Sequence, residues 1–241
     1  MPAPDSSAPP RSACDHARAG CAGAALCRFA PREEQKPHPE HLPRGGRLAL
    51  VPAAERWCFH AVRSGLVGVA VRVPGGRRQI LCLTGPGELV CPGAPGGPET
   101  RLEALAPTDL CRIDLSAGVE RLRRNPAFRE QIGALTGLGL AHGYERIVAL
   151  GTLDGPARLA AFLAEMAGRM GERRETGLHL SLAMTREDIA DYLGLNADTV
   201  SRLLNRLRRA GFVRFLSPTS MEIPDLRSLA AAGSGHPQAR A

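Results

Sequence analysis

The stretch that decides the fold runs from Met184 to Val213 and reads MTREDIADYLGLNADTVSRLLNRLRRAGFV. Thr185 and Asp188 make a capping-box-like start for a short helix, which Gly194 ends. After a tight turn, Asn196 is placed to cap a second helix. The second helix carries an apolar stripe formed by Val200, Leu203, Leu204 and Leu207. This pattern predicts a helix-turn-helix.

Three polar residues lie together near the start of the second helix, which is the end that enters the major groove in this motif. Asp198, Ser201 and Arg202 are spaced i, i+3 and i+4, so they share one face. An arginine fork binds guanine, a carboxylate accepts from an exocyclic amine, and a serine hydroxyl serves either role. We therefore predict that these three residues read bases.

Basic residues follow the predicted reading residues, and a second element follows the helix. The predicted phosphate contacts are Arg206, Arg208, Arg209 and Arg214. Gly211 is placed to end the helix, and the segment from Phe212 to Ile223, with Ser217-Pro218-Thr219-Ser220 in its middle, predicts a β-hairpin wing. The stretch as a whole therefore predicts a winged helix-turn-helix that binds double-stranded DNA.

Upstream of this stretch, the pattern changes from β-type to helical. Short β-type runs separated by turns occupy residues 48–115 and predict a small antiparallel roll, with runs at 57–62, 66–73, 80–83 and 102–115. Residues 119–150 are helical in pattern, although glycines at 133, 137, 139 and 143 each weaken a helix by up to roughly 1 kcal/mol relative to alanine. Asp154 is placed to cap a further amphipathic helix. The fold class is therefore α+β.

Composition limits the classes of function. The chain has 241 residues, with 31 basic and 24 acidic side chains, which suits a polyanionic partner without proving one. It has neither the run of about 18 apolar residues that a membrane span needs nor a secretory N-terminus, so we expect a cytoplasmic protein. Cys58 near His60 is the only hint of a nucleophile, and Gly137-x-Gly139-x3-Gly143 follows no strand, so we expect no enzyme.

The residues from 184 to 213 closely resemble the DNA-binding domain of the CRP/FNR superfamily of bacterial transcription regulators. The core D-T-V-S-R at 198–202 is similar to the E-T-x-S-R signature of the FNR branch, with Asp198 in place of glutamate. Arg63-Ser64-Gly65 and Gly85-Pro86-Gly87-Glu88-Leu89 resemble turns of that family's β-roll, so the resemblance covers roughly residues 48–224. The shorter Asp198 keeps an acceptor but loses reach, so its base preference needs to be measured.

The resemblance implies an organisation and a set of partners. Proline-rich composition at 1–12 and 31–46 predicts loop or disordered segments within a flexible leader (1–47), and the Ala/Gly/Ser-rich end predicts a disordered tail (228–241). The resemblance implies a β-roll of double-stranded β-helix type (48–118), a long dimerisation helix (119–152) and a winged helix-turn-helix (153–227). It also implies a homodimer on palindromic DNA with TTGAT-type half-sites about one helical turn apart, and contact with RNA polymerase. The glycines suggest a hypothesis, in which a marginal helix pair leaves dimerisation under the control of the roll.

The cysteines suggest a cofactor through which such a regulator would sense its signal. Cys14, Cys21 and Cys27 lie within fourteen residues, and grouped thiolates suit an iron–sulfur cluster or zinc. The FNR branch holds an oxygen-labile [4Fe-4S] cluster with a cysteine-rich N-terminus and one roll cysteine. The resemblance therefore implies Cys14, Cys21, Cys27 and Cys111 as ligands. The family's C-x2-C-x5-C would need a cysteine at Arg18, so Cys14 must stand in through a wider loop.

Other inputs stay open, namely zinc, thiol oxidation, a small ligand in the roll, or haem with nitric oxide or carbon monoxide. His60 is a candidate axial ligand for haem, and His16 a candidate replacement for a thiolate. We expect no cyclic nucleotide, because residues 91–105 lack the arginine–serine pair that the family uses for the cyclic phosphate. Cys58 and Cys82 lie in apolar runs and are expected to pack as small hydrophobes, with Cys91 as a reserve ligand.

Overall fold

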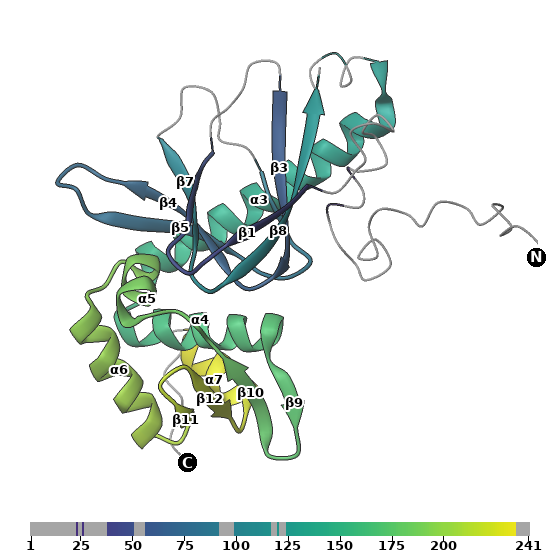
Figure 1. The fold of residues 1–241 in the computed structure, drawn as a ribbon. Coiled ribbons are helices and arrows are strands. Elements are labelled where there is room, and N and C mark those ends of the chain that lie inside the picture. The colour runs from purple at the N-terminus through teal and green to yellow at the C-terminus, as the bar shows by residue number, and fades with distance from the viewer. Residues whose placement is uncertain are drawn as a thin grey trace, which may run out of the picture. The chain divides into compact units, whose positions relative to one another are not determined.

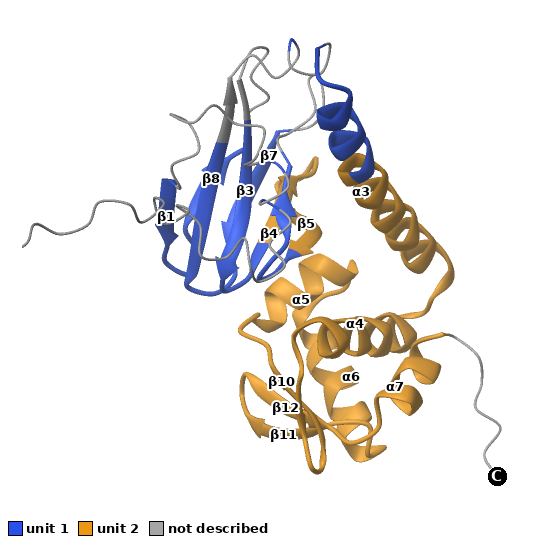
Figure 2. Ribbon diagram, turned by 90° about the vertical axis from the view of Figure 1, so that its right-hand side faces the viewer, with its two compact units in different colours: residues 1–67, 84–134 blue, residues 68–83, 135–241 orange. Residues whose placement is uncertain are grey.

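The computed structural model describes residues 23, 26, 38–50, 56–91, 99–116, 120 and 124–234. The chain divides into two compact units, which Figure 2 shows in blue and orange. The first, here the sheet unit, comprises residues 1–67 and 84–134, and the second, here the C-terminal unit, comprises residues 68–83 and 135–241. The division into five segments expected from the sequence is finer than these two units and stays a prediction.

The sheet unit is built from antiparallel strands that match the β-type runs of the sequence (Figure 1). Its strands are β1 (His38–Leu42), β2 (Arg47–Ala49), β3 (Arg56–Ser64), β6 (Leu89–Val90), β7 (Thr100–Ala104) and β8 (Thr108–Ser116). One sheet has the order β1–β8–β3–β6, and β2 pairs with β7. Phe59 lies opposite Ile113 and Val62 opposite Leu110, so apolar side chains of neighbouring strands meet in the core.

Gly65 makes the turn at the end of β3 possible. Its φ is +88°, and a Cβ atom there would lie 2.3 Å from the carbonyl oxygen of Pro107. Only glycine fits this close approach of two backbones without strain. The turn expected at Arg63-Ser64-Gly65 is therefore explained by a steric requirement.

Strand β1 corrects the expectation that residues 31–46 form a loop within a flexible leader. Residues 38–42 pair with β8 in antiparallel register, with Pro39 opposite Cys111. Proline is tolerated here because β1 is the edge strand of its sheet, where one row of backbone donors has no strand to bind. Proline content therefore does not exclude a strand at the edge of a sheet.

Helix α3 (Pro126–Thr152) lies within the segment predicted to be helical. Phe128 is fully buried, whereas most of the following residues are exposed. Beyond each of the four glycines there is open space where a Cβ atom would lie. The large apolar side chains that α3 exposes are Leu138, Leu140, Tyr144, Ile147, Val148 and Leu150. The helix thus offers an uncovered apolar surface within the described chain.

The C-terminal unit combines helices with a small antiparallel sheet. All but the end residues Val67 and Thr84 of β4 (Val67–Arg72) and β5 (Arg78–Thr84) belong to it. Its other elements are α4 (Gly155–Met170), β9 (Glu172–Arg174), β10 (Gly177–Ser181), α5 (Arg186–Leu193), α6 (Ala197–Arg209), β11 (Arg214–Ser217), β12 (Ser220–Ile223) and α7 (Leu226–Gly233). The sheet order is β11–β12–β10–β9. Leu159, Leu163 and Met166 of α4 are fully buried, as their helical spacing predicts.

Helix α7 corrects the expectation of a disordered tail from residue 228. The side chain of Asp225 caps the helix by accepting from the backbone of Arg227, and Leu229 is fully buried. Gly233 lies so close to α4 that a Cβ atom would be 2.5 Å from the Ala161 nitrogen. The alanine- and glycine-rich composition therefore reflects close helix packing up to residue 233. Within the described residues, no helix has both the length and the apolarity to cross a membrane.

Candidate nucleic-acid interface

Helices α5 and α6 begin and end as the sequence predicts. The Thr185 hydroxyl accepts from the Asp188 backbone at 3.0 Å, and the Asp188 carboxylate accepts from the Thr185 backbone at 2.9 Å, so the capping box is complete. Gly194 ends α5 in the left-handed conformation. The Asn196 side chain caps α6 by accepting from Thr199 at 2.7 Å. The predicted helix-turn-helix is confirmed as a local structure.

The three predicted base-reading residues share the side of α6 that faces away from the core. Asp198 and Arg202 are exposed and Ser201 is half-buried, whereas Val200 and Leu204 on the other side are buried. The Arg202 guanidinium donates to the Thr199 hydroxyl at 3.3 Å, which leaves most of its donors directed at solvent. We call Asp198, Ser201 and Arg202 the reading face.

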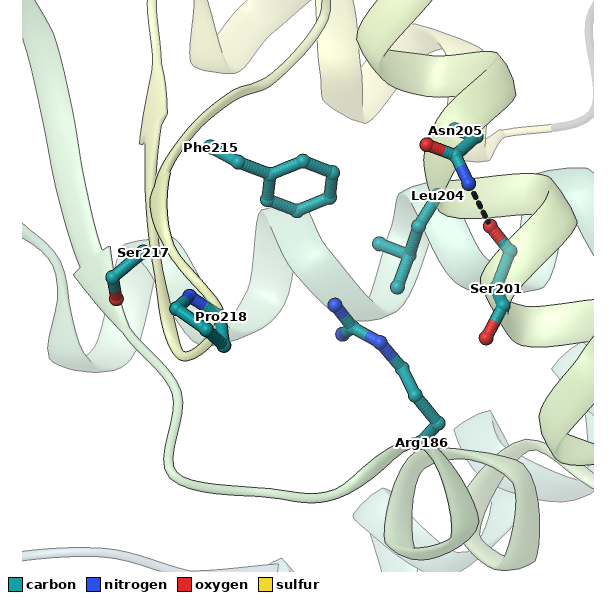
Figure 3. A pocket seen from close by; sticks show the side chains of 7 residues that line it. All are labelled: Arg186, Ser201, Leu204, Asn205, Phe215, Ser217 and Pro218. Carbon is teal, nitrogen blue, oxygen red and sulfur yellow. Dashed lines mark hydrogen bonds between the residues drawn. The ribbon is translucent and has the colours of Figure 1, made fainter.

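A cleft lies between the reading face and the wing. It has a volume of about 390 Å³ and is lined by Arg186, Ser201, Leu204, Asn205, Phe215, Ser217 and Pro218. Figure 3 shows the Arg186 guanidinium reaching from the start of α5 into the space between α6 and the wing. The guanidinium carbon lies 5.8 Å from the centre of the Phe215 ring, and the Asn205 amide donates to the Ser201 carbonyl at 3.1 Å. We call this space the wing cleft.

Arg186 is the functional candidate that the sequence analysis missed. Its partial burial lowers the pKa of the guanidinium, yet arginine keeps its charge in water. Arg186 is the only charged residue among those lining the wing cleft, so the cleft suits an anion such as a phosphodiester. The residue stands between Thr185 and Glu187, where the capping signal dominated the interpretation. Arg186 lines a cleft only because the wing folds beside α5, and no local sequence pattern indicates that neighbour.

The predicted phosphate-binding arginines fall into two groups. Arg206, Arg208 and Arg209 are exposed at the C-terminal end of α6. Arg214 instead lies 2.8 Å from the carboxylate of Glu222, whose side chain is only 8% exposed. Because Arg214 neutralises a buried carboxylate on the neighbouring strand, its first role is in the wing itself. The phosphate contacts of Arg206, Arg208, Arg209 and Arg214 all stay predictions.

The predicted cluster ligands are only partly within the described residues. Cys14, Cys21 and Cys27 lie outside them, whereas Cys111 is buried in β8, opposite Pro39 and Ala61 on the two neighbouring strands. Among the described residues, no group of three or more histidine, cysteine or acidic side chains is arranged to hold a metal ion. The described part of the chain thus supplies a single thiol of the predicted set, and this donor set alone does not fit a cluster.

The remaining histidine and cysteine candidates have separate surroundings. His60 is buried, and its Nε2 atom lies 3.6 Å from Glu40 and 3.8 Å from the Cys58 sulfur. Glu40 also pairs with Arg112 at 3.0 Å, so His60 belongs to a polar cluster within the sheet unit. Cys58 is half-buried, but Cys82 and Cys91 are exposed. The expectation that Cys82 packs as a small hydrophobe is therefore wrong, because its strand turns that position outward.

The chain is similar to known proteins in one domain and, more weakly, over most of its length. Residues 157–232 match the model of the Crp-like helix-turn-helix domain. The nitrogen fixation regulation protein FixK of Rhizobium meliloti is 31% identical over 175 residues, which are 71% of this chain and 77% of that protein. The anaerobic regulatory protein of Pasteurella multocida is 31% identical over 157 residues, or 64% of this chain. The chain spans 58% of the length of that second relative.

A solved structure extends the similarity beyond the helix-turn-helix. The structure of FixK2 from Bradyrhizobium japonicum has a TM-score of 0.70 and 26% identity, and the match covers 81% of this chain and 96% of that one. Both sequence relatives are named as regulatory proteins and neither as an enzyme, which agrees with the expectation from the sequence. The similarity thus includes the sheet unit as well as the helix-turn-helix.

Proposed function

Because the chain belongs to the CRP/FNR family of transcription regulators, we propose that it is a regulator that binds DNA in a sequence-specific manner. The observation that carries this proposal is the exposed reading face of α6 beside the wing cleft. The reading face supplies an arginine fork, a carboxylate and a hydroxyl for base edges. Arg186 in the cleft supplies a cation for the adjacent backbone phosphate.

We also propose that the regulator is a homodimer that binds a palindrome. Leu140, Tyr144 and Ile147 of α3 recur at spacings of four and three residues and are 53%, 59% and 67% exposed. We call these three residues the seam. Such spacing puts apolar side chains on one face of a helix, where a second copy of α3 buries them. Two reading faces on one dimer suit two half-sites about one helical turn apart.

The DNA-binding proposal is tested by comparing Arg202→Ala with Arg208→Ala. Loss of the Arg202 fork is expected to weaken binding to a palindrome of TTGAT-type half-sites by about 1–3 kcal/mol, and to relax discrimination at one base pair. Arg208→Ala is expected to weaken specific and unrelated DNA alike. Titrations with a panel of single-base variants measure both. Unchanged discrimination in Arg202→Ala would contradict the proposed readout.

As the group that senses the controlling signal, we propose an oxygen-sensitive [4Fe-4S] cluster with Cys14, Cys21, Cys27 and Cys111 as ligands. This proposal is supported by the sequence resemblance and by relatives named as anaerobic regulators. The alternative is a regulator of the same family without a cluster. It is supported by the burial of Cys111 between β1 and β3, which leaves this residue only 6% exposed. Contact with RNA polymerase is proposed from family membership alone.

Iron and acid-labile sulfide analysis separates these two inputs. Protein purified without oxygen is expected to contain both elements and to show visible absorption that changes on exposure to air. Cys111→Ser is expected to lose the iron, whereas Cys82→Ser, which changes an exposed cysteine of another strand, is expected to keep it. A colourless protein without iron would favour the cluster-free alternative, whatever the DNA titrations show.

A further inference from the structure

The hairpin formed by β4 and β5 lies far from the helix-turn-helix in sequence but groups with it in space. Residues 68–83 belong to the C-terminal unit, although they fall inside the segment predicted as the sensor roll and outside the residues that match the helix-turn-helix model. Figure 2 shows this segment in the colour of the C-terminal unit.

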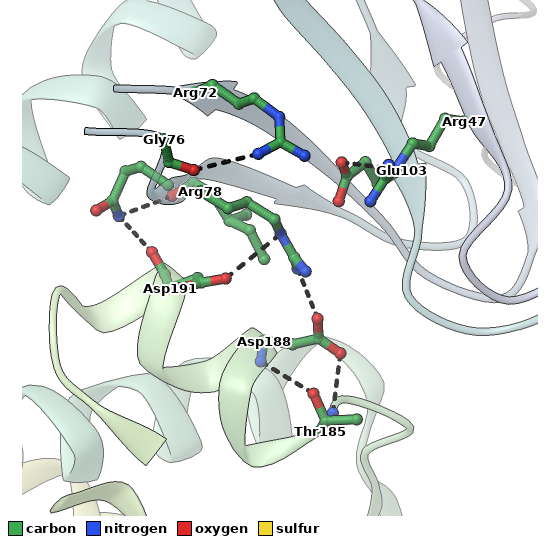
Figure 4. Close-up of polar contacts among 10 residues, drawn as sticks. Arg47, Arg72, Gly76, Arg78, Glu103, Thr185, Asp188 and Asp191 are labelled. Carbon is green, nitrogen blue, oxygen red and sulfur yellow. Dashed lines mark hydrogen bonds and ion pairs between the residues drawn. The ribbon is translucent and has the colours of Figure 1, made fainter. Parts of the chain in front are cut away.

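Arg78 of β5 binds the start of α5. Its guanidinium lies 2.5 Å from one carboxylate oxygen of Asp188, while the other oxygen accepts from the Thr185 backbone (Figure 4). The Asp188 side chain is only 6% exposed and that of Arg78 is 25% exposed. A charge-assisted hydrogen bond in such a shielded place is stronger than one at the surface. Asp188 therefore joins the cap of α5 to the hairpin.

The hairpin also binds the last turn of α5 and the helix before it. The Gln79 amide donates to the backbone carbonyl of Asp191, and the Arg78 Nε atom lies 3.5 Å from the Asp191 carboxylate. Carbonyls in the last turn of a helix have no partner within the helix, so Gln79 satisfies a group that needs a donor. On α4, Arg169 donates to the Leu83 carbonyl at 3.0 Å.

These contacts leave the reading face uncovered. The hairpin binds α5 and α4, and Asp198 and Arg202 on α6 are exposed while the contacts are made. A contact that blocked DNA would instead cover these side chains. The bound hairpin is therefore compatible with an α6 that is available to a DNA groove.

We infer that the β4–β5 hairpin is a latch, which holds α5 through Arg78 and Gln79 and so couples the sensor segment to DNA affinity. The DNA part of this inference rests on the proposed function. Coupling needs an element with two arrangements that both sites bias. The hairpin lies in the segment predicted as the sensor, and its side chains bind the first helix of the helix-turn-helix, so it is placed to be that element. With the latch engaged, the helix-turn-helix is held in its DNA-binding arrangement.

The structural half of the test is Arg78→Ala, with Arg77→Ala as its matched control. Arg77 is the preceding residue, carries the same charge and is exposed. In the full-length protein, hydrogen exchange of peptides covering residues 186–193 is expected to rise in Arg78→Ala and to stay as in the wild type in Arg77→Ala. The effects of Arg78→Ala and Asp188→Asn on the thermal midpoint are expected to be non-additive. Unchanged exchange or full additivity would overturn the latch.

The functional half uses DNA titration of the same variants. The dissociation constant of Arg78→Ala for the palindrome is expected to rise about 5- to 10-fold, with no change for Arg77→Ala. Tighter binding, or equal binding despite faster exchange in α5, would overturn the coupling. If the wild type itself does not bind the palindrome, the proposed function fails, and the exchange measurement still decides whether the hairpin holds α5.

Discussion

Arg186 shows how one residue gains a role from the residues folded around it. Its position as the first residue of α5 is ordinary, but the wing brings Phe215 and Ser217 to the other side of its guanidinium. A cation in a cleft beside the reading face adds affinity for a phosphodiester without sequence preference. In the proposed function, Arg186 thus complements Arg202, whose fork is proposed to read a base.

Arg186→Ala is therefore expected to weaken binding to every DNA sequence by a similar factor. The slope of the logarithm of the binding constant against the logarithm of salt concentration should fall in magnitude by about 1, because one phosphate contact is lost. Arg173→Ala removes an equal charge from β9, at the opposite edge of the sheet from β11, and should change the slope less. A loss confined to one DNA sequence would contradict this role.

Asp188 gives the C-terminal unit a dependence on pH. Burial alone would raise the pKa of its carboxyl, but hydrogen bonds from Arg78 and from the Thr185 backbone and side chain outweigh burial and lower it. A carboxyl whose pKa is lower in the folded state stabilises the fold above its unfolded pKa. That stabilisation is lost as the pH falls through the folded value. The group therefore matters at neutral pH and not in strong acid.

Urea unfolding of the wild type and of Asp188→Asn tests this sign. The difference in free energy of unfolding is expected to be constant from about pH 7 to about pH 5 and to shrink below about pH 4. Arg78→Ala removes one cause of the lowered pKa, so the pH dependence of stability should be shallower in that variant. A difference between wild type and Asp188→Asn that persists unchanged into acid would show that the carboxylate charge is not what stabilises the fold.

At the scale of elements, α3 and α6 are stabilised in different ways. Helix α6 has a cap, a buried stripe and basic residues in its last turn, all of which stabilise a helix locally. Helix α3 has one buried residue and five glycines with open space around them, so its own sequence stabilises it little. It therefore depends on what covers its exposed face.

Gly139→Ala should accordingly stabilise the protein. Nothing lies within 4 Å of the added Cβ atom, and position 139 is off the seam, so the gain is the helix propensity of alanine, up to about 1 kcal/mol. A thermal melt followed by circular dichroism should show a midpoint higher by about 2–4 °C. Gly65→Ala is the contrasting variant and should lower the midpoint, because φ is +88° there. A lower midpoint for Gly139→Ala would mean that a hidden partner fills this space.

At the scale of the whole molecule, dimerisation and DNA binding are expected to be linked. Two helix-turn-helix units on one dimer bind a palindrome with the combined affinity of both half-sites, whereas a monomer engages a single half-site. The seam on α3 is the surface that joins two chains in this proposal. Oligomeric state and affinity for the palindrome should therefore change together.

Leu140→Asp tests this linkage, with His142→Asp as its control. A carboxylate in the seam should convert the dimer to a monomer in sedimentation, and binding to the palindrome should fall to that for one half-site. His142 is exposed on another face of α3, so the same new charge there should leave the dimer intact. A Leu140→Asp protein that remains dimeric would show that the copies meet through a different surface.

Much of the fold was predictable because the deciding signals are local. The capping box at Thr185, the turn at Gly194 and the cap at Asn196 each depend on residues within four positions, and the structure contains all three. The β-type run at 57–62 was likewise recognisable from alternation and turns, whereas the run predicted at 102–115 is divided between β7 and β8. Reading residues on α6 were recognisable because helical spacing alone puts them on one side.

By itself, the sequence determined the helix-turn-helix, its capping residues, the reading face and the main strands, because each follows from backbone preferences and short-range periodicity. Only the tertiary structure decided that Arg186 lines a cleft with the wing, that Arg78 binds Asp188 across 110 positions, and that β1 and α7 are ordered. The physical reason is distance along the chain. An ion pair, an edge strand or a packed helix depends on which remote segment folds beside it, and no local pattern records that neighbour.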